Sequence, residues 1–365
     1  DVIKVEPPGG DSMRRTGPFI DGVDSPENSL HWRHYNTNKR SITLDIESED
    51  GGALLRRLAE NSDVMLESFQ PGYLDSLGLG YGHLSDGNPG LIFASLTPFG
   101  QTGPYSEYQG EEIVSYAMGM IMSISGSQGR APLKHGGFQS QYEGGLNGAA
   151  STAICLFGME NGCGGQHIDV AINDCVASTM MATQTMYPFM GGTQHRRRAT
   201  GQDFTYPMPC ADGWVIVQTG GAASWDDIVG LFQEPKLLDS RFSNTDERAE
   251  NGEEMDKIMV DALSRLNKWD LFANAAMARI LFGLVQTPRE IVECPQLESR
   301  EFFREVEHPV IGKIKIPAVL FNFSLCPYEL RHPAPTLGQH NQEIYVDGLG
   351  YSQEDFCRLR QLNAI

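Results

Sequence analysis

The pattern of hydrophobic and polar positions in the first half of the chain predicts strands that alternate with helices. Short apolar or alternating segments bounded by turn residues are expected to form strands, at 41–45, 63–69, 91–96 and 167–172. Apolar residues at helical spacing predict helices at 48–61, 111–122 and 144–159, and Ser48 is placed to cap the first of them. This alternation is typical of an α/β fold with a largely parallel sheet.

After residue 190 the pattern changes, which predicts a second, smaller domain. A glycine-rich stretch leads into the strand WVIVQT, amphipathic helices are expected through 224–306, and a β-hairpin is expected around Gly312. We predict a large domain at 1–200, a small domain at 201–320 and a C-terminal return to the large domain at 321–365. The opening DVIKVEPPGG is typical of the middle of a strand and its exit loop, so we expect a preceding strand and helix to be missing.

The composition excludes several classes of protein. Of the 365 residues, 40% are hydrophobic and 21% charged, which is ordinary for a globular protein, and the net charge of −19 argues against a nucleic-acid-binding surface. No apolar run approaches the length of a membrane-spanning helix. The seven cysteines form no CxxC pair and the nine histidines no HExxH motif. We therefore expect a reducing, cytoplasmic location and no metal, membrane or nucleic-acid partner.

The segment GGFQSQYEGGLNGAAST, residues 136–152, is the most informative local feature. A glycine-bracketed turn leads into a helix of small residues, and such a turn can present a reactive side chain. It offers Gln139, Ser140, Gln141 and Glu143, but no Asp, Cys, His or Lys. Small residues also let a helix pack closely against its neighbour, which is a purely structural role. Elsewhere no GxGxxG, P-loop or GxSxG motif is found, and the basic run at 195–198 could bind an anion or be a solvated loop.

The order of several longer segments indicates a family. These segments are DVIKVEPPGGDSMR, NTNKRSITLD, SDVMLESFQPGYLDSLGLGY, NPGLIFASLTPFGQTGPY, GGQHIDVAINDC, YPMPCADGWVIV, HPVIGKIKIPAV and RHPAPTLGQHNQEI. Through almost the whole chain they resemble the family III CoA-transferases, the superfamily of formyl-CoA and carnitine CoA-transferases and α-methylacyl-CoA racemase. The resemblance implies a Rossmann-like large domain, a smaller α+β domain and an interlocked dimer. It also implies a coenzyme A thioester as substrate and no covalently bound cofactor.

The resemblance further assigns positions in the site. The family's transferases use an Asp carboxylate that attacks the donor thioester, forms a mixed anhydride and becomes an enzyme-bound CoA thioester. Counted back from Gln166 of GCGGQ, that Asp corresponds to Gln141, and Glu143 is a nearby carboxylate that could substitute for it. Many relatives carry Arg where this chain has Ser76, and at least one carries Lys near Gln109. The Arg that usually precedes the GxGQ turn is Met159 here. The positions that match the family's CoA site are Leu44, Ser68, Phe69, Ser76, Leu77 and Gln109.

A carboxamide cannot form the anhydride, so we predict a catalytically silent subunit that pairs with a homologous, Asp-bearing catalytic subunit in a heterodimer or heterotetramer. The complex would move CoA between an acyl-CoA such as succinyl-CoA and a carboxylic acid. Two-subunit transferases of anaerobic aromatic degradation suggest benzylsuccinate or a related aryl-succinate as the acid. The alternatives are an active transferase that uses Glu143, a non-enzymatic binding or scaffold protein on the same fold, and a CoA-dependent racemase or dehydratase, for which a proton-transfer pair is missing.

Overall fold

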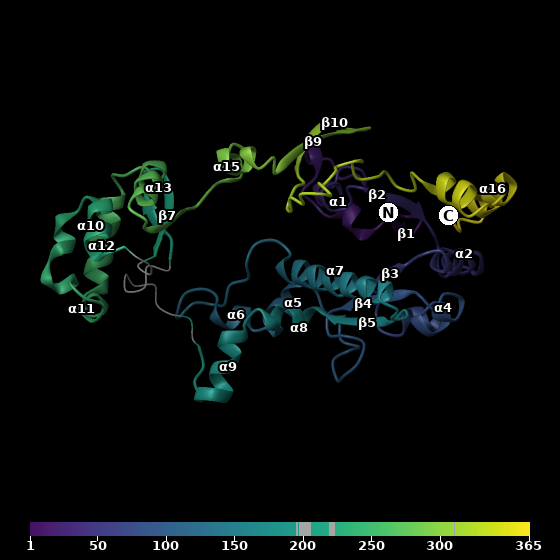
Figure 1. Cartoon of the computed structure of the whole chain (residues 1–365), viewed down its shortest axis with the longest axis horizontal. Helices are drawn as coiled ribbons and strands as arrows, with labels where there is room; N and C mark the ends of the chain where they lie inside the picture. The colour runs from purple at the N-terminus through teal and green to yellow at the C-terminus, as the bar shows by residue number, and fades with distance from the viewer. Residues whose placement is uncertain (195, 197–205, 219–222, 310) are drawn as a thin grey trace. The chain divides into compact units, whose positions relative to one another are not determined.

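The computed structural model describes residues 1–194, 196, 206–218, 223–309 and 311–365, which form two compact units (Figure 1). The main unit consists of Asp1–Ser123, Lys134–Thr193 and Pro295–Ile365. The second unit consists of Ile124–Leu133 and Gln194–Cys294. The chain therefore leaves the main unit twice and returns to it each time.

Parallel strands form the sheets at the centre of the main unit. β3 (Val64–Glu67), β4 (Ile92–Thr97) and β5 (His167–Ala171) pair in this order, and both outer strands run parallel to β4. β1 (Val2–Glu6) pairs in parallel with β2 (Lys39–Thr43). The predicted α/β fold is thus confirmed, although the strand predicted at 41–45 lies two residues earlier.

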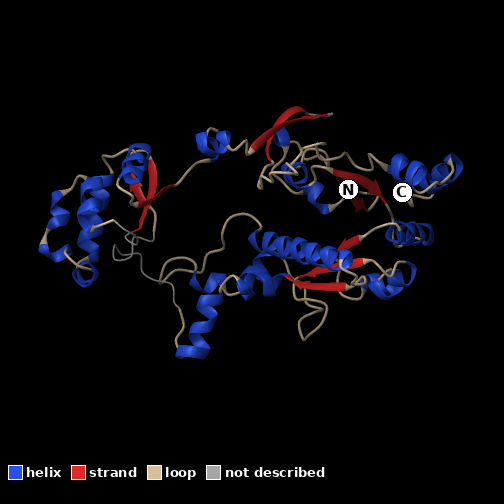
Figure 2. Ribbon diagram, viewed as in Figure 1, coloured by secondary structure: helices blue, strands red, loops and turns tan. Residues whose placement is uncertain are grey.

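Helices connect the strands (Figure 2). Those of the main unit and its borders are α1 (Leu30–Tyr35), α2 (Glu49–Glu60), α3 (Tyr73–Ser76), α4 (Tyr81–Gly87), α5 (Glu112–Met118), α6 (Ile121–Ile124), α7 (Gln139–Glu160), α8 (Ile172–Ser178), α9 (Met181–Met190), α15 (Pro295–Ser299) and α16 (Gln353–Gln361). Ser48 caps α2 as predicted, because its side chain accepts a hydrogen bond from the Gly51 amide. The single helix predicted at 111–122 is wrong: it is split into α5 and α6, where Met120 has a left-handed φ of 77°.

The hydrophobic core of the main unit joins the two ends of the chain. Leu54 of α2 and Phe93 of β4 lie in the same buried cluster as Tyr345 and Phe356 from the C-terminal segment. Tyr345 belongs to a π-helical turn, Glu343–Gly348, and its hydroxyl donates a hydrogen bond to the Thr43 carbonyl at 2.8 Å. The last residues of the chain therefore contribute to the same core as the first strands.

Glycines let α7 approach the sheet closely. A Cβ on Gly148 would lie 2.8 Å from Cδ2 of Leu96 on β4, and one on Gly144 would lie 2.8 Å from Cγ1 of Ile172 on α8. Larger side chains at either position would push the helix away from the strand or from its neighbouring helix. The small residues noticed in the sequence therefore have the packing role, at least on this face of α7.

The second unit combines an antiparallel sheet with helices. β6 (Met208–Cys210), β7 (Gly213–Gln218) and β8 (Leu281–Leu284) pair in this order. The helices are α10 (Trp225–Phe232), α11 (Thr245–Glu250), α12 (Gly252–Leu263), α13 (Lys268–Met277) and α14 (Pro288–Val292). The stretch predicted as helical, 224–306, is therefore interrupted by β8. Of the basic run at 195–198, only Arg196 lies within the described residues.

The predicted β-hairpin belongs to the main unit. β9 (Phe303–His308) and β10 (Gly312–Pro317) pair in an antiparallel arrangement, and Gly312, which has a left-handed φ of 71°, opens the second strand. The hairpin predicted around Gly312 is confirmed.

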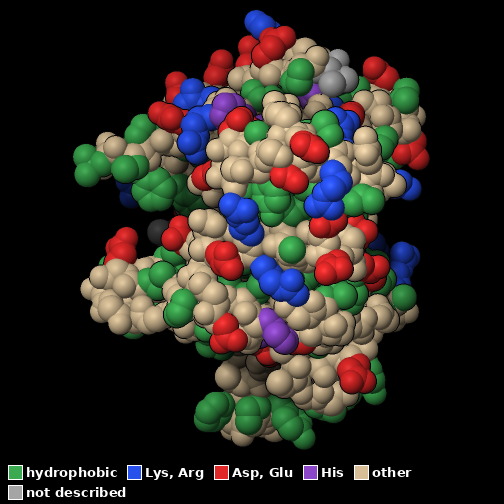
Figure 3. Space-filling model, turned by 90° about the vertical axis from the view of Figure 1, so that its right-hand side faces the viewer, with side chains coloured by type: hydrophobic (Ala, Val, Ile, Leu, Met, Phe, Trp, Pro, Cys, Tyr) green, Lys and Arg blue, Asp and Glu red, His purple; other side chains and the backbone are tan. Residues whose placement is uncertain are grey.

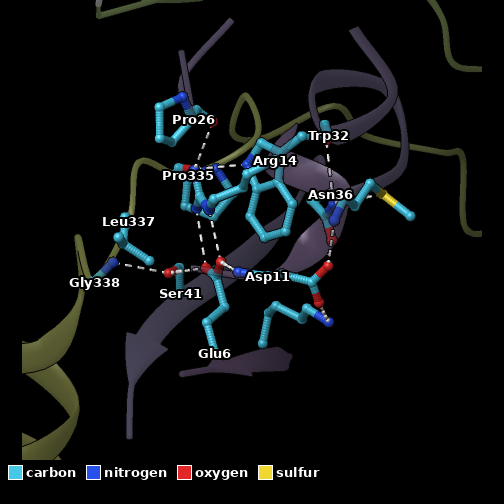
Figure 4. A network of polar contacts seen from close by, with 12 residues as sticks. Glu6, Asp11, Arg14, Pro26, Trp32, Asn36, Ser41, Pro335, Leu337 and Gly338 are labelled. Carbon is cyan, nitrogen blue, oxygen red and sulfur yellow. Dashed lines mark hydrogen bonds and ion pairs between the residues drawn. The ribbon is translucent and has the colours of Figure 1, made fainter. Parts of the chain in front are cut away.

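A buried polar network ties together three of the segments that carry the family resemblance (Figure 4). Arg14 is 1% exposed and contacts the Glu6 carboxylate through Nε at 2.6 Å and Nη2 at 3.0 Å. Its Nη2 also donates to the Pro335 carbonyl at 3.2 Å, and its guanidinium stacks over the Trp32 ring. Ser41 donates to the same Glu6 carboxylate at 2.6 Å. The network therefore fixes the N-terminal strand against the C-terminal segment.

Candidate active site

Gln141 lies in the first turn of α7, and its side chain is exposed. The sequence predicted a turn through this position and a helix from residue 144, and that boundary is wrong because α7 already begins at Gln139. Phe138, at the position that usually caps a helix, provides no side-chain hydrogen bond. The acceptor that the first turn requires comes from another helix.

Glu112 of α5 is that acceptor. Its Oε2 accepts hydrogen bonds from the Ser140 amide at 3.0 Å, the Ser140 hydroxyl at 2.5 Å and the Gln141 amide at 3.3 Å. Its Oε1 is paired with Lys134 at 3.4 Å, and Glu112 is only 7% exposed. The carboxylate thus supplies a negative charge at the positive end of the helix and fixes the backbone of residue 141. The sequence reasoning missed Glu112, because it lies far upstream of α7.

Glu143 faces away from Gln141. Two residues along a helix correspond to a rotation of about 200° around its axis. In agreement with this, the Glu143 carboxylate acts on Cys175 of α8: burial raises the pKa of that thiol, and the charges of Asp174 and Glu143 raise it further. A substrate held at the exposed side chain of Gln141 would therefore not meet the Glu143 carboxylate from the same side.

Aromatic side chains of α1 pack against the start of α7. The Tyr35 hydroxyl donates to the Tyr142 hydroxyl at 2.6 Å, and burial, followed by this partner, raises the pKa of Tyr35. The rings of His31 and Phe138 pack edge to face with their centroids 5.2 Å apart, and the centroids of the His34 and Tyr35 rings lie 4.6 Å apart. The segment HWRHY was not singled out in the sequence, since its neighbours in space lie about a hundred residues away.

The positions that match the CoA site fall into two groups. Leu44 is 2% exposed within the core, and Leu77 packs against that core. The others are exposed: Ser68 and Phe69 follow β3, Ser76 ends α3, and Gln109 donates to the Gln70 side chain at 2.7 Å. The structure therefore brings Phe69 and Gln109 to neighbouring loops, whereas the side chain of Leu44 is not accessible to a ligand.

A basic side chain that the sequence did not suggest lies beside these loops. Nη2 of Arg56, from α2, is 3.4 Å from the position that a Cβ on Gly78 would take, two residues after Ser76. An arginine here could pair with a phosphate although position 76 itself is Ser.

A cavity of about 160 Å³ adjoins the same loops but does not suit a phosphate. Its lining includes the carboxylates of Glu67 and Asp75, and burial raises the pKa of Glu67. Ser95 and His167, also in the lining, are hydrogen-bonded at 2.9 Å. Two carboxylates repel an anion, so we do not assign the CoA phosphates to this cavity.

Metal-binding clusters and helices that could span a membrane are both absent from the described part of the chain. There, no cluster of three or more His, Cys, Asp or Glu side chains is arranged to hold a metal ion. None of the described helices is both long and apolar enough to cross a membrane. On the face drawn in Figure 3, acidic and basic side chains are interspersed.

Comparison with known proteins agrees with the α/β fold. The sequence signature of CoA-transferase family III matches residues 1–341, so the chain belongs to this family, as the motifs predicted. The enzymes of this family use CoA thioesters as substrates.

Individual relatives match over nearly their whole length. Succinyl-CoA–D-citramalate CoA-transferase of Chloroflexus aurantiacus is 31% identical, with 100% of this chain and 91% of that protein covered. Succinyl-CoA:(R)-benzylsuccinate CoA-transferase subunit BbsE of Thauera aromatica is 28% identical, with coverages of 100% and 92%. The crystal structure of a CAIB/BAIF family protein from Brucella suis superposes with a TM-score of 0.85 at 28% identity, covering 95% of this chain and 91% of that one.

Proposed function

We propose that this chain is the catalytically silent subunit of a cytoplasmic, hetero-oligomeric CoA-transferase. Its partner in the heterodimer or heterotetramer would be a homologous chain with Asp at the position of Gln141. The complex would transfer CoA between an acyl-CoA such as succinyl-CoA and a carboxylic acid. Benzylsuccinate or a related aryl-succinate is a candidate acid, because one relative is a subunit of a benzylsuccinate transferase.

The observation that carries the proposal is the carboxamide of Gln141 at the exposed start of α7. A carboxylate oxygen can attack a thioester and expel the CoA thiolate, whereas a neutral amide is a poor nucleophile and yields no anhydride. Neither neighbouring carboxylate replaces it. Glu143 lies about 200° around α7 from Gln141, and Glu112 is buried with three hydrogen bonds to one oxygen and Lys134 at the other.

Exposed apolar surfaces support a protein partner. On α7, Leu146, Ile154 and Phe157 are 65%, 71% and 69% exposed. Further large apolar side chains are exposed on α9 and in the segment that follows β10: Phe189, Met190, Leu320, Phe321, Phe323 and Leu325. Concentrations of exposed apolar side chains usually mark interaction surfaces, and a threaded partner chain would cover them.

Trapping of a covalent intermediate tests the silence of this chain. The purified chain is incubated with succinyl-CoA, treated with borohydride to reduce any enzyme-bound thioester, and digested for peptide mass spectrometry. We expect the peptide containing Gln141 and Glu143 to be unchanged. A modified Glu143 would instead establish an active transferase with a displaced nucleophile. An unmodified chain that also leaves the rate of every candidate partner unchanged would favour a scaffold protein.

A further inference from the structure

The first turn of α7 is held by a carboxylate from another helix, and this arrangement does not depend on which side chain stands at position 141. Glu112 binds two consecutive backbone amides, those of Ser140 and Gln141. Its carboxylate also accepts a hydrogen bond from the Ser140 hydroxyl. The side chain of residue 140 therefore points into the protein, whereas residue 141, the next position around the helix, is exposed to solvent. The backbone that aims the side chain at position 141 is therefore fixed from α5.

The charge of Glu112 is itself held in place. Lys134 approaches its Oε1 at 3.4 Å, and the same ammonium donates to the carbonyl of His135 at 2.8 Å and to that of Gly137 at 2.5 Å. Lys134 thus connects the carboxylate to the turn that enters α7. The Lys134 ammonium lies over the Tyr116 ring, 5.9 Å from its centroid. Burial raises the pKa of Tyr116, and the nearby Glu112 charge raises it further.

We propose that Glu112, held by Lys134, is a positioning residue for the side chain at position 141. It fixes the direction of that side chain, and its negative charge offsets the partial positive charge at the start of α7. An unshielded helix end would stabilise an anion at position 141 and so weaken it as a nucleophile. With Glu112 in place, a nucleophile at this position keeps ordinary acidity. The inference rests on the proposed function, since it concerns the same site. It means that this site lacks the nucleophile but retains the carboxylate that would orient one.

Other charged and titratable groups near this end of α7 come from the entering turn, from α1, α5 and α8, and from α7 itself. They are Lys134 and His135 from the entering turn, Tyr116 from α5, and His31, His34 and Tyr35 from α1, the last bonded to Tyr142. Asp174 of α8 and Glu143 of α7 both raise the pKa of the Cys175 thiol through their charges. The carboxylate that accepts a hydrogen bond from the backbone amide of residue 141 is that of Glu112.

A thiol introduced at the exposed position reports the local charge without any CoA ester. In Gln141→Cys, the rate of iodoacetamide labelling at residue 141 is followed against pH by peptide mass spectrometry, which separates it from the native cysteines. We expect a thiol pKa close to that of an ordinary cysteine. Adding Glu112→Gln should lower this pKa by about one unit, because the helix end is no longer offset. Adding Lys134→Met should raise it, since the carboxylate then acts without its cation.

Glu143→Gln on the same background is the matched control, because it removes a carboxylate from the same helix but from the opposite face; it should leave the thiol pKa unchanged. Thermal unfolding of each variant verifies that the fold is intact. Because Glu112→Gln and Lys134→Met should shift the thiol pKa in opposite directions, either variant alone tests the proposal if the other is unstable. Equal pKa values in all variants would overturn the positioning role. That outcome would not affect the silent-subunit proposal. Acylation of the native chain by succinyl-CoA would instead overturn the silent-subunit proposal and leave the role of Glu112 untouched.

Discussion

Replacing Arg14 by Met should destabilise the main unit strongly, because it leaves the Glu6 carboxylate buried without its cation. Arg14 is 1% exposed and binds both oxygens of Glu6, whose side chain is fully buried. Removing one partner of such a pair costs about 3–5 kcal/mol. Two donors remain on Glu6, the Ser41 hydroxyl at 2.6 Å and the Asp11 amide at 3.1 Å. We therefore expect the loss in the free energy of unfolding to lie near the lower end, about 3 kcal/mol.

Urea unfolding at fixed protein concentration measures this loss, with circular dichroism as the signal. Adding Glu6→Gln to Arg14→Met removes the unpaired charge and keeps acceptors for Ser41 and Asp11, so the double variant should regain part of the stability. Arg15→Met, at the exposed neighbouring position, is the control and should change stability by less than about 0.5 kcal/mol. A loss below about 1 kcal/mol for Arg14→Met, or a double variant less stable than the single one, would refute the reasoning.

Further predictions concern the site and the fold around it. Gln141→Asp should gain a carboxylate that succinyl-CoA acylates, seen as a covalent adduct by intact-protein mass spectrometry; a variant that binds CoA yet forms no adduct would contradict this. Glu143→Gln in the same background should leave adduct formation unchanged. Gly148→Val should cost about 1–3 kcal/mol, measured by thermal unfolding, because its side chain would overlap that of Leu96. Burial lowers the pKa of His308 from 6.5 to about 4, so the unfolded chain binds a proton at higher pH than the folded chain. Stability should accordingly fall by up to about 1.4 kcal/mol per pH unit as the pH drops from 6.5 towards 4, and His308→Gln should remove that slope in urea unfolding.

The local pattern of apolar and polar residues was sufficient to predict most strands and helices of the main unit. The strands β3, β4 and β5 lie where short apolar segments predicted them, and Ser48 caps α2 as its position before two acidic residues suggested. The family followed from the order of the motifs, and the matching signature over residues 1–341 confirms it.

What the sequence could not provide were contacts between distant residues. The start of α7 was placed five residues too late, because its capping carboxylate, Glu112, comes from 28 positions before Ser140. The Arg14–Pro335 hydrogen bond joins residues 321 positions apart, which no local periodicity reveals. For the same reason, the packing of Tyr35 against Tyr142 beside Gln141 was not expected.

The silent-subunit proposal is tested most directly by native mass spectrometry of the complex, purified from its own source through a tag on this chain. The account predicts a second, homologous chain in equal amount, with Asp at the position equivalent to Gln141. A homodimer of this chain alone, active in transferring CoA from succinyl-CoA to a carboxylic acid, would contradict it.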